Sequence, residues 1–275
     1  MRFGSWRLWD AGIDWRAIEP AKGQWRFEKL DHLMALAEQN GVEPVFVFGV
    51  TPQWASARPD EPFVYGAGGA AEPRDLRDWE NFVRTVAMRY KGRIKHFELW
   101  NEPKYADIEP VKGSFYTGTL ASLVQLGCSA YQVLKEVDPS NKLLTPGFTG
   151  AGDRLDGFLA AGGKGCSDIV AFHFYTSTPE KMLERVQEVK EIMRTHGIAD
   201  RPLWNTEQGY EVVGPNAKIP GNAGFEVRDM ETQAAYIPRS LVLAAAAGVE
   251  RFFFYSWERL LMEKETLPTV GASAL

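Results

Sequence analysis

Segments with the apolar pattern of strands alternate with helix-like segments along all 275 residues, without a compositional break. This alternation is typical of one parallel α/β domain spanning 1–275, because each helix returns the chain to the start of the next strand. No Gly-rich phosphate loop follows the first strand-like run, and the length suits a barrel, so a TIM-type (β/α)8 barrel is favoured over an open sheet. The expected strands begin near seven residues: Phe3, Val45, Ile94, Lys142, Ile169, Leu203 and Val249.

An eight-fold barrel needs one strand more than these seven. The tail 266–275 is too rich in small and turn residues to supply it, so either a terminal unit is missing or a loop hides a strand. The stretch 15–25 is expected to be a loop, and 57–73 and 210–227 are loops long enough to be functional. Helices are expected over 27–40, 74–91, 120–137, 155–161, 179–196 and 230–247.

Two of the expected strands close on a glutamate. The run from His96 reaches Glu102 just before Pro103, where the strand should stop because proline cannot donate to a sheet ladder. The run from Leu203 reaches Glu207 shortly before a glycine. The carboxyl ends of parallel strands form the rim on which barrel enzymes build their active sites, so Glu102 and Glu207 are the candidate catalytic pair.

Two facing carboxyl groups are what glycoside hydrolysis requires. One protonates the leaving oxygen, and the other attacks the anomeric carbon or activates water. Their environments must keep one protonated and the other ionised at neutral pH. A single strand-end glutamate is more often a salt-bridged rim residue, but here two occur in a Trp-Asn-(Thr)-Glu context. A barrel lyase or aldolase would need a strand-end lysine, and the nearest candidate is Lys104, beyond Pro103.

Charge and composition argue against several partners. The net charge of -5 and the lack of a basic run argue against nucleic acid, and no apolar run reaches the roughly 18 residues of a membrane span. Cys128 and Cys166 lack metal spacing and are expected to be free thiols. No His/Asp/Cys cluster has ligand spacing, so neither a metal nor another cofactor is expected. Localisation stays open: secreted or periplasmic if a signal was removed, otherwise cytoplasmic.

Several motifs together resemble glycoside hydrolase clan A. Phe97-Glu98-Leu99-Trp100-Asn101-Glu102-Pro103 resembles the acid/base motif of the clan, and Trp204-Asn205-Thr206-Glu207-Gln208-Gly209 resembles its nucleophile motif. Four further motifs follow the same order: Arg7-Leu8-Trp9-Asp10, Trp15-Arg16-Ala17-Ile18-Glu19-Pro20, Pro52-Gln53-Trp54-Ala55 and His173-Phe174-Tyr175. The resemblance covers nearly the whole chain and is greatest to families 39 and 5, the former more than the latter.

The resemblance implies a (β/α)8 barrel with the acid/base on the fourth strand and the nucleophile on the seventh. Here the two glutamates fall on the third and sixth expected strands. The missing unit is therefore expected to be the first strand and its helix, upstream of Met1, with the last helix truncated. The edge at 3–10 would then be exposed, closed against the last strand, or paired in a homo-oligomer.

The resemblance also implies residue roles in a retaining double displacement. Glu102 becomes the general acid/base and Glu207 the nucleophile, with Arg7 lowering the pKa of Glu207 while that of Glu102 stays raised. Arg7 could instead simply neutralise Glu98. Substrate contacts are expected from Asn101, Arg7, His173, Tyr175, Trp257, Trp54 and Trp9. The expected substrate is a polysaccharide or oligosaccharide with β-glycosidic bonds, and the alternative is a non-catalytic carbohydrate-binding barrel or inactive fragment.

Overall fold

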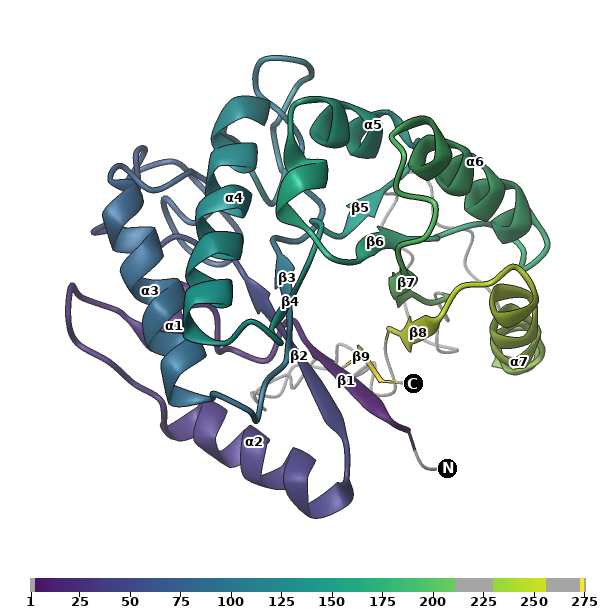
Figure 1. The fold of residues 1–275 in the computed structure, drawn as a ribbon, viewed down its shortest axis with the longest axis horizontal. Helices are drawn as coiled ribbons and strands as arrows, with labels where there is room; N and C mark the ends of the chain where they lie inside the picture. Colours follow the sequence, from purple (N-terminus) through teal and green to yellow (C-terminus); the bar gives the residue numbers. More distant parts are fainter. Residues whose placement is uncertain (1–2, 211–229, 256–272, 275) are drawn as a thin grey trace.

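A computed structural model of the chain describes residues 3–210, 230–255 and 273–274, which form two sheets (Figure 1). The first sheet has the order β4-β3-β2-β1-β9 and the second the order β5-β6-β7-β8. Every pair of neighbours is parallel except β1 and β9. The strands are β1 (Ser5–Leu8), β2 (Glu43–Phe48), β3 (His96–Leu99), β4 (Lys142–Leu144), β5 (Phe148–Thr149), β6 (Val170–His173), β7 (Leu203–Gln208), β8 (Arg251–Phe254) and β9 (Ser273–Ala274).

Strands β4 and β5 are two halves of one segment that joins the sheets. The first half pairs with β3 and the second with β6, and Pro146, which cannot donate to a ladder, lies between them. A parallel bridge from Leu144 to Ile169 connects the two sheets. Counting β4 and β5 as one position, the described residues provide the seven parallel strands predicted from the sequence, arranged as a partial (β/α)8 barrel.

Helices cover the outside of both sheets: α2 to α4 lie outside the first and α5 to α7 outside the second (Figure 1). One element was not predicted in the stretch 15–25, where the Asp14 carboxylate accepts a hydrogen bond from the backbone N–H of Ala17 and caps a single helical turn. The helices are α1 (Trp15–Ile18), α2 (Glu28–Asn40), α3 (Leu76–Arg89), α4 (Leu120–Val137), α5 (Asp153–Ala160), α6 (Lys181–Thr195) and α7 (Met230–Ala246), with a 3₁₀ turn η1 (Gly163–Cys166).

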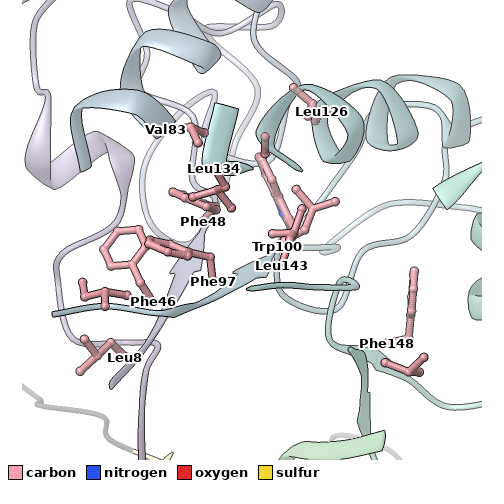
Figure 2. Packing of buried hydrophobic residues seen from close by; sticks show 14 of the residues in the cluster. Leu8, Phe46, Phe48, Val83, Phe97, Trp100, Leu126, Leu134, Leu143 and Phe148 are labelled. Carbon is pink, nitrogen blue, oxygen red and sulfur yellow. The ribbon is translucent and has the colours of Figure 1, made fainter. Parts of the chain in front are cut away.

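Both faces of the strands are apolar. Alternate residues such as Phe46, Phe48 and Phe97 pack outward in one cluster with residues of α3 and α4 (Figure 2). The intervening positions point into the barrel, where side chains from both sheets meet: Val45, Leu144, Ile169, Ala171, Trp204 and Phe253. Burial on both faces explains the continuous apolar runs in the sequence. Among the described residues, no helix is long and apolar enough to span a bilayer.

The tail 266–275 was not expected to supply the missing parallel strand, but it contains a short antiparallel one. Residues 273–274 form β9, which pairs antiparallel with β1 and also contacts β8. Pairing at an edge uses backbone groups, so small side chains do not prevent it. The chain itself therefore covers the edge of β1, which weakens the case for pairing with a second subunit.

The prediction of free thiols was wrong. Cys128 on α4 and Cys166 in η1 form a disulfide that closes a loop with a sequence separation of 38 residues. The pair has no motif spacing, because it depends on the packing of α4 against η1 rather than on local sequence. A disulfide closing 38 residues stabilises the fold by about 4 kcal/mol, mainly by constraining the unfolded chain.

Candidate active site

Backbone strain marks the rim at the carboxyl ends of the first strands. The described non-glycine residues with positive φ are Asp10 (55°), Val50 (56°), Trp100 (64°) and Glu102 (39°), just beyond β1, β2 and β3. Such conformations cost free energy and concentrate at functional sites. This rim is where the sequence analysis placed the site.

At the ends of β3 and β7, successive side chains do not simply alternate between the two faces of the sheet. Strand β3 ends at Leu99, not at Glu102 as predicted, because Trp100 and Glu102 adopt positive φ. On β7 the register shifts between Asn205 and Gln208, and such an irregularity can re-aim side chains. The consecutive residues Thr206 and Glu207 consequently both make contacts inside the barrel mouth.

Arg7 is fully buried and connects three strands. Its Nε donates to Glu98 Oε2 at 2.5 Å, and its Nη1 donates to Glu207 Oε2 at 2.8 Å. Its Nη2 donates to Asn101 Oδ1 at 2.7 Å. One guanidinium therefore contacts both of the carboxylates that were considered from the sequence, Glu98 and Glu207.

The environment of Glu102 favours the protonated form of its carboxyl group. Burial raises its pKa to about 7, although the charge of Arg7 opposes the shift. His173 Nδ1 lies 2.9 Å from Glu102 Oε1, and burial lowers the pKa of this histidine to about 4, so its ring is neutral at pH 7. Glu102 therefore has no imidazolium beside it to favour ionisation at neutral pH.

Glu207 receives a donor on each oxygen. Arg7 donates to Oε2, and the Tyr175 hydroxyl donates to Oε1 at 2.7 Å. Arg7 lowers the pKa of Glu207 as expected, but the effect of burial on this pKa is larger. Burial raises the pKa of Glu207 overall, while Arg7 and Tyr175 act in the opposite direction.

The two glutamates and His173 converge. One ligand atom from each of Glu102, His173 and Glu207 lies within 4.8 Å of the others, the one such cluster of potential metal ligands in the described part of the chain. A permanent cation, the Arg7 guanidinium, already contacts Glu207 and opposes a metal ion there. The expectation of no metal or other cofactor stays a prediction.

The predicted aromatic contacts are dispersed. Trp9 is buried at the rim, with its ring centroid 5.7 Å from that of Tyr65. Trp54 instead packs against Trp15 and donates to the carbonyl of Glu19 at 2.8 Å. Trp257 and the loop 211–227 lie outside the described residues. The structure thus brings together Arg7, Asn101, Glu102, His173, Tyr175 and Glu207 but gives Trp54 contacts elsewhere.

Three residues at this rim were not assigned from the sequence. Asp10 accepts hydrogen bonds from the hydroxyls of Tyr65 and Tyr255, the latter at 2.7 Å. Asp10 follows β1 as Glu102 follows β3, so the rule that found the glutamates could have identified it. Tyr65 lies in the non-periodic loop 57–73, and its sequence context carries no such signal.

Comparisons with known proteins concern the family and the fold of the chain. The family described as "Glycosyl hydrolases family 39" matches residues 1–252. Endo-1,4-beta-xylanase A of Phanerodontia chrysosporium is 27% identical over 135 residues, which cover 48% of this chain and 30% of that protein.

Two solved structures are similar in fold. A glucosidase from Croceicoccus marinus has a TM-score of 0.65 at 18% identity, covering 91% of this chain and 51% of that chain. A monomeric beta-xylosidase from Caulobacter crescentus CB15 has a TM-score of 0.65 at 22% identity, covering 84% and 49%. The chain thus spans about half the length of these two proteins and less of the xylanase.

Proposed function

The chain belongs to glycosyl hydrolase family 39, and from this premise we propose that it hydrolyses β-glycosidic bonds with retention of configuration. Glu207 is the proposed nucleophile and Glu102 the general acid/base. The observation that carries the proposal is the convergence of these two carboxyl groups in unlike environments, one bound to an arginine and a tyrosine, the other to a neutral histidine.

The spacing favours the retaining mechanism. Carboxyl groups of retaining enzymes lie about 5–5.5 Å apart, whereas inverting enzymes need about 6.5–9.5 Å to admit water. Ligand atoms of Glu102 and Glu207 within 4.8 Å of each other fit the shorter spacing. In the first step the carboxyl of Glu102 donates its proton to the leaving oxygen while the carboxylate of Glu207 attacks the anomeric carbon.

Arg7 helps to place the charge on Glu207 rather than on Glu102. It contacts Glu207 Oε2 directly at 2.8 Å, whereas no direct contact with the carboxylate of Glu102 is among the bonds of the described residues. Arg7 also binds Asn101 Oδ1, which leaves the amide NH₂ of Asn101 to donate to the hydroxyl beside the reacting carbon. A bond of this kind strengthens in the transition state.

His173 supports the proton cycle of Glu102. Its Nε2 has no hydrogen-bond partner among the described residues and lies 4.0 Å from Glu98 Oε1. The tautomer with hydrogen on Nε2 points that hydrogen toward a carboxylate and leaves Nδ1 to accept from protonated Glu102. In the second step, Glu102 as a carboxylate takes a proton from the water that releases the sugar from Glu207.

The proposed substrate is a polysaccharide or oligosaccharide with β-linked sugars. The names of the relatives, a xylanase, a xylosidase and a glucosidase, make β-xylosides and β-glucosides the first to test. The long loop 57–73 could wall a cleft and favours endo action. The Cys128–Cys166 disulfide supports a secreted or periplasmic location, because disulfides persist in oxidising compartments.

The test is hydrolysis of aryl β-glycosides followed by NMR of the anomeric proton. The β-anomer should form first and then mutarotate. Initial formation of the α-anomer would contradict the retaining mechanism. If the chain binds oligosaccharides but hydrolyses none across a broad panel, the rival proposal of a non-catalytic carbohydrate-binding barrel is correct.

The pH dependence of kcat/KM should reflect Glu102. A general acid must be protonated, and the pKa of Glu102 is raised to about 7, so activity should fall as pH rises through about 7. The Glu102→Gln variant should lose this alkaline limb on substrates whose leaving group needs no proton, such as a dinitrophenyl glycoside. A wild-type profile that stays flat to pH 9 on a poor leaving group would show that another group donates the proton.

A further inference from the structure

Asp10 is a third carboxylate at the rim that the proposed mechanism does not use. It is partly exposed, follows β1 and holds a left-handed backbone with φ of 55°. Its Oδ1 accepts from the Tyr65 hydroxyl of the loop 57–73, and its Oδ2 accepts from the Tyr255 hydroxyl just beyond β8. Aspartate tolerates a left-handed backbone better than most residues, so the φ value of Asp10 alone does not indicate a function. The two hydrogen bonds with tyrosines are the stronger indication.

The three residues lie on the nucleophile's side of the site. The backbone N–H of Tyr255 donates to the carbonyl of Gln208, the residue after Glu207, at 2.8 Å. Burial and the charge of Asp10 raise the pKa values of Tyr65 and Tyr255, and the carboxylate of Glu207 adds a smaller rise to both. Because Glu207 attacks the anomeric carbon, groups beside it face the sugar that becomes bound to the enzyme.

The hydrogen bonds fix what this group can offer a ligand. Each tyrosine has one proton and gives it to Asp10, so its oxygen is left as an acceptor. The ionised Asp10 also has only acceptor sites. The three side chains therefore present acceptors and one negative charge, without a donor.

We propose that Asp10, Tyr65 and Tyr255 form a glycone subsite that accepts hydrogen bonds from sugar hydroxyls and rejects a glycone bearing a carboxylate. A neutral sugar supplies donors to all three groups. A uronate would place its charge and its acceptor oxygens against the same atoms, which leaves polar groups unpaired and opposes like charges. This selection rests on the proposed function, because it concerns the sugar held against Glu207.

The test compares aryl β-D-glucoside, β-D-xyloside and β-D-glucuronide as substrates. The wild type should show at least about 100-fold lower kcat/KM for the glucuronide than for the better neutral sugar, since sites built for particular hydrogen bonds discriminate strongly. Asp10→Asn removes the charge and adds an N–H donor. In this variant the ratio of kcat/KM on the neutral sugar to kcat/KM on the glucuronide should fall by at least about tenfold. The value of kcat/KM should fall for the neutral sugar and rise for the glucuronide.

Asp60→Asn is the matched control, because Asp60 is an exposed aspartate in the same loop as Tyr65, and it should leave the ratio unchanged. A second variant distinguishes selection of the sugar by Asp10 from a purely structural role, in which Asp10 only holds the loop 57–73 next to β8. Tyr255→Phe keeps the charge of Asp10, so discrimination against the glucuronide should persist. If Asp10 only ties these segments together, Asp10→Asn and Tyr255→Phe should lower activity on all three sugars equally, which would overturn the proposal.

A failure of the proposed function would give a different result from a failure of the proposed subsite. If the wild type hydrolyses none of the glycosides, titration calorimetry with methyl β-D-glucoside and methyl β-D-glucuronide still tests the subsite on the folded protein. Preference for the neutral sugar, lost in Asp10→Asn, supports the subsite. Equal affinity for both sugars overturns it, as does a wild type that hydrolyses the glucuronide as well as the glucoside.

Discussion

Replacing Glu207 by alanine is expected to lower kcat/KM by roughly 10⁴- to 10⁶-fold, the range seen when an enzyme loses its nucleophile. The variant has no group to form the covalent intermediate, while Arg7 and Tyr175 stay in place to bind an anion. Initial rates on an aryl β-glycoside measure the loss. Glu184→Ala is the control, because Glu184 is exposed on α6, and it should retain wild-type activity.

Azide should rescue the Glu207→Ala variant partly, because the anion fits the space left by the carboxylate and attacks the same carbon. The product should be the inverted α-glycosyl azide. The Glu102→Ala variant should instead form the β-glycosyl azide on an activated substrate, because there azide attacks the covalent intermediate. Normal activity of Glu207→Ala, or the β-azide from it, would assign the nucleophile to another residue.

Much of the scaffold could be predicted because it depends on local pattern. Helix α4 (Leu120–Val137) has the predicted bounds, since it runs from the cap at Thr119 to the stop before Pro139. The elements that could not be predicted depend on tertiary contacts. Strand β9 exists because β1 offers an unpaired edge, and the disulfide exists because α4 packs on η1.

The candidate site divides in the same way. Glu102 and Glu207 could be found from the rule that barrel sites lie at strand ends, and Arg7, His173 and Tyr175 from the resemblance. The net rise in the pKa of Glu207 could not be predicted, because desolvation depends on how deeply the folded chain buries this carboxylate. The alternation of side chains between the two faces of a strand does not hold where φ is positive or where the register shifts. The contact between Glu98 and Thr206 could therefore not be predicted from the sequence.

Arg7→Met is expected to lower the free energy of unfolding by about 3–5 kcal/mol, because it leaves buried carboxylates without their cation. Glu98 is fully buried, Glu207 nearly so, and both contact this one guanidinium. Urea unfolding followed by circular dichroism measures the change. Arg84→Met is the control, since Arg84 forms a half-exposed pair with Glu136, and it should cost at most about 1 kcal/mol.

The double variant Arg7→Met/Glu98→Gln tests the cause of that loss. If uncompensated charge is responsible, removing one carboxylate should restore at least about 1 kcal/mol, although the contacts of Arg7 with Glu98, Glu207 and Asn101 are all absent. The decrease in the free energy of unfolding caused by Arg7→Met should also become smaller as pH falls. Without Arg7 the already raised pKa of Glu207 rises further, so the folded state takes up its proton at higher pH than the unfolded chain and gains stability on acidification. A double variant less stable than Arg7→Met would show instead that Glu98 acts chiefly through its bond with Thr206, and that the buried charge is not what makes Arg7 necessary.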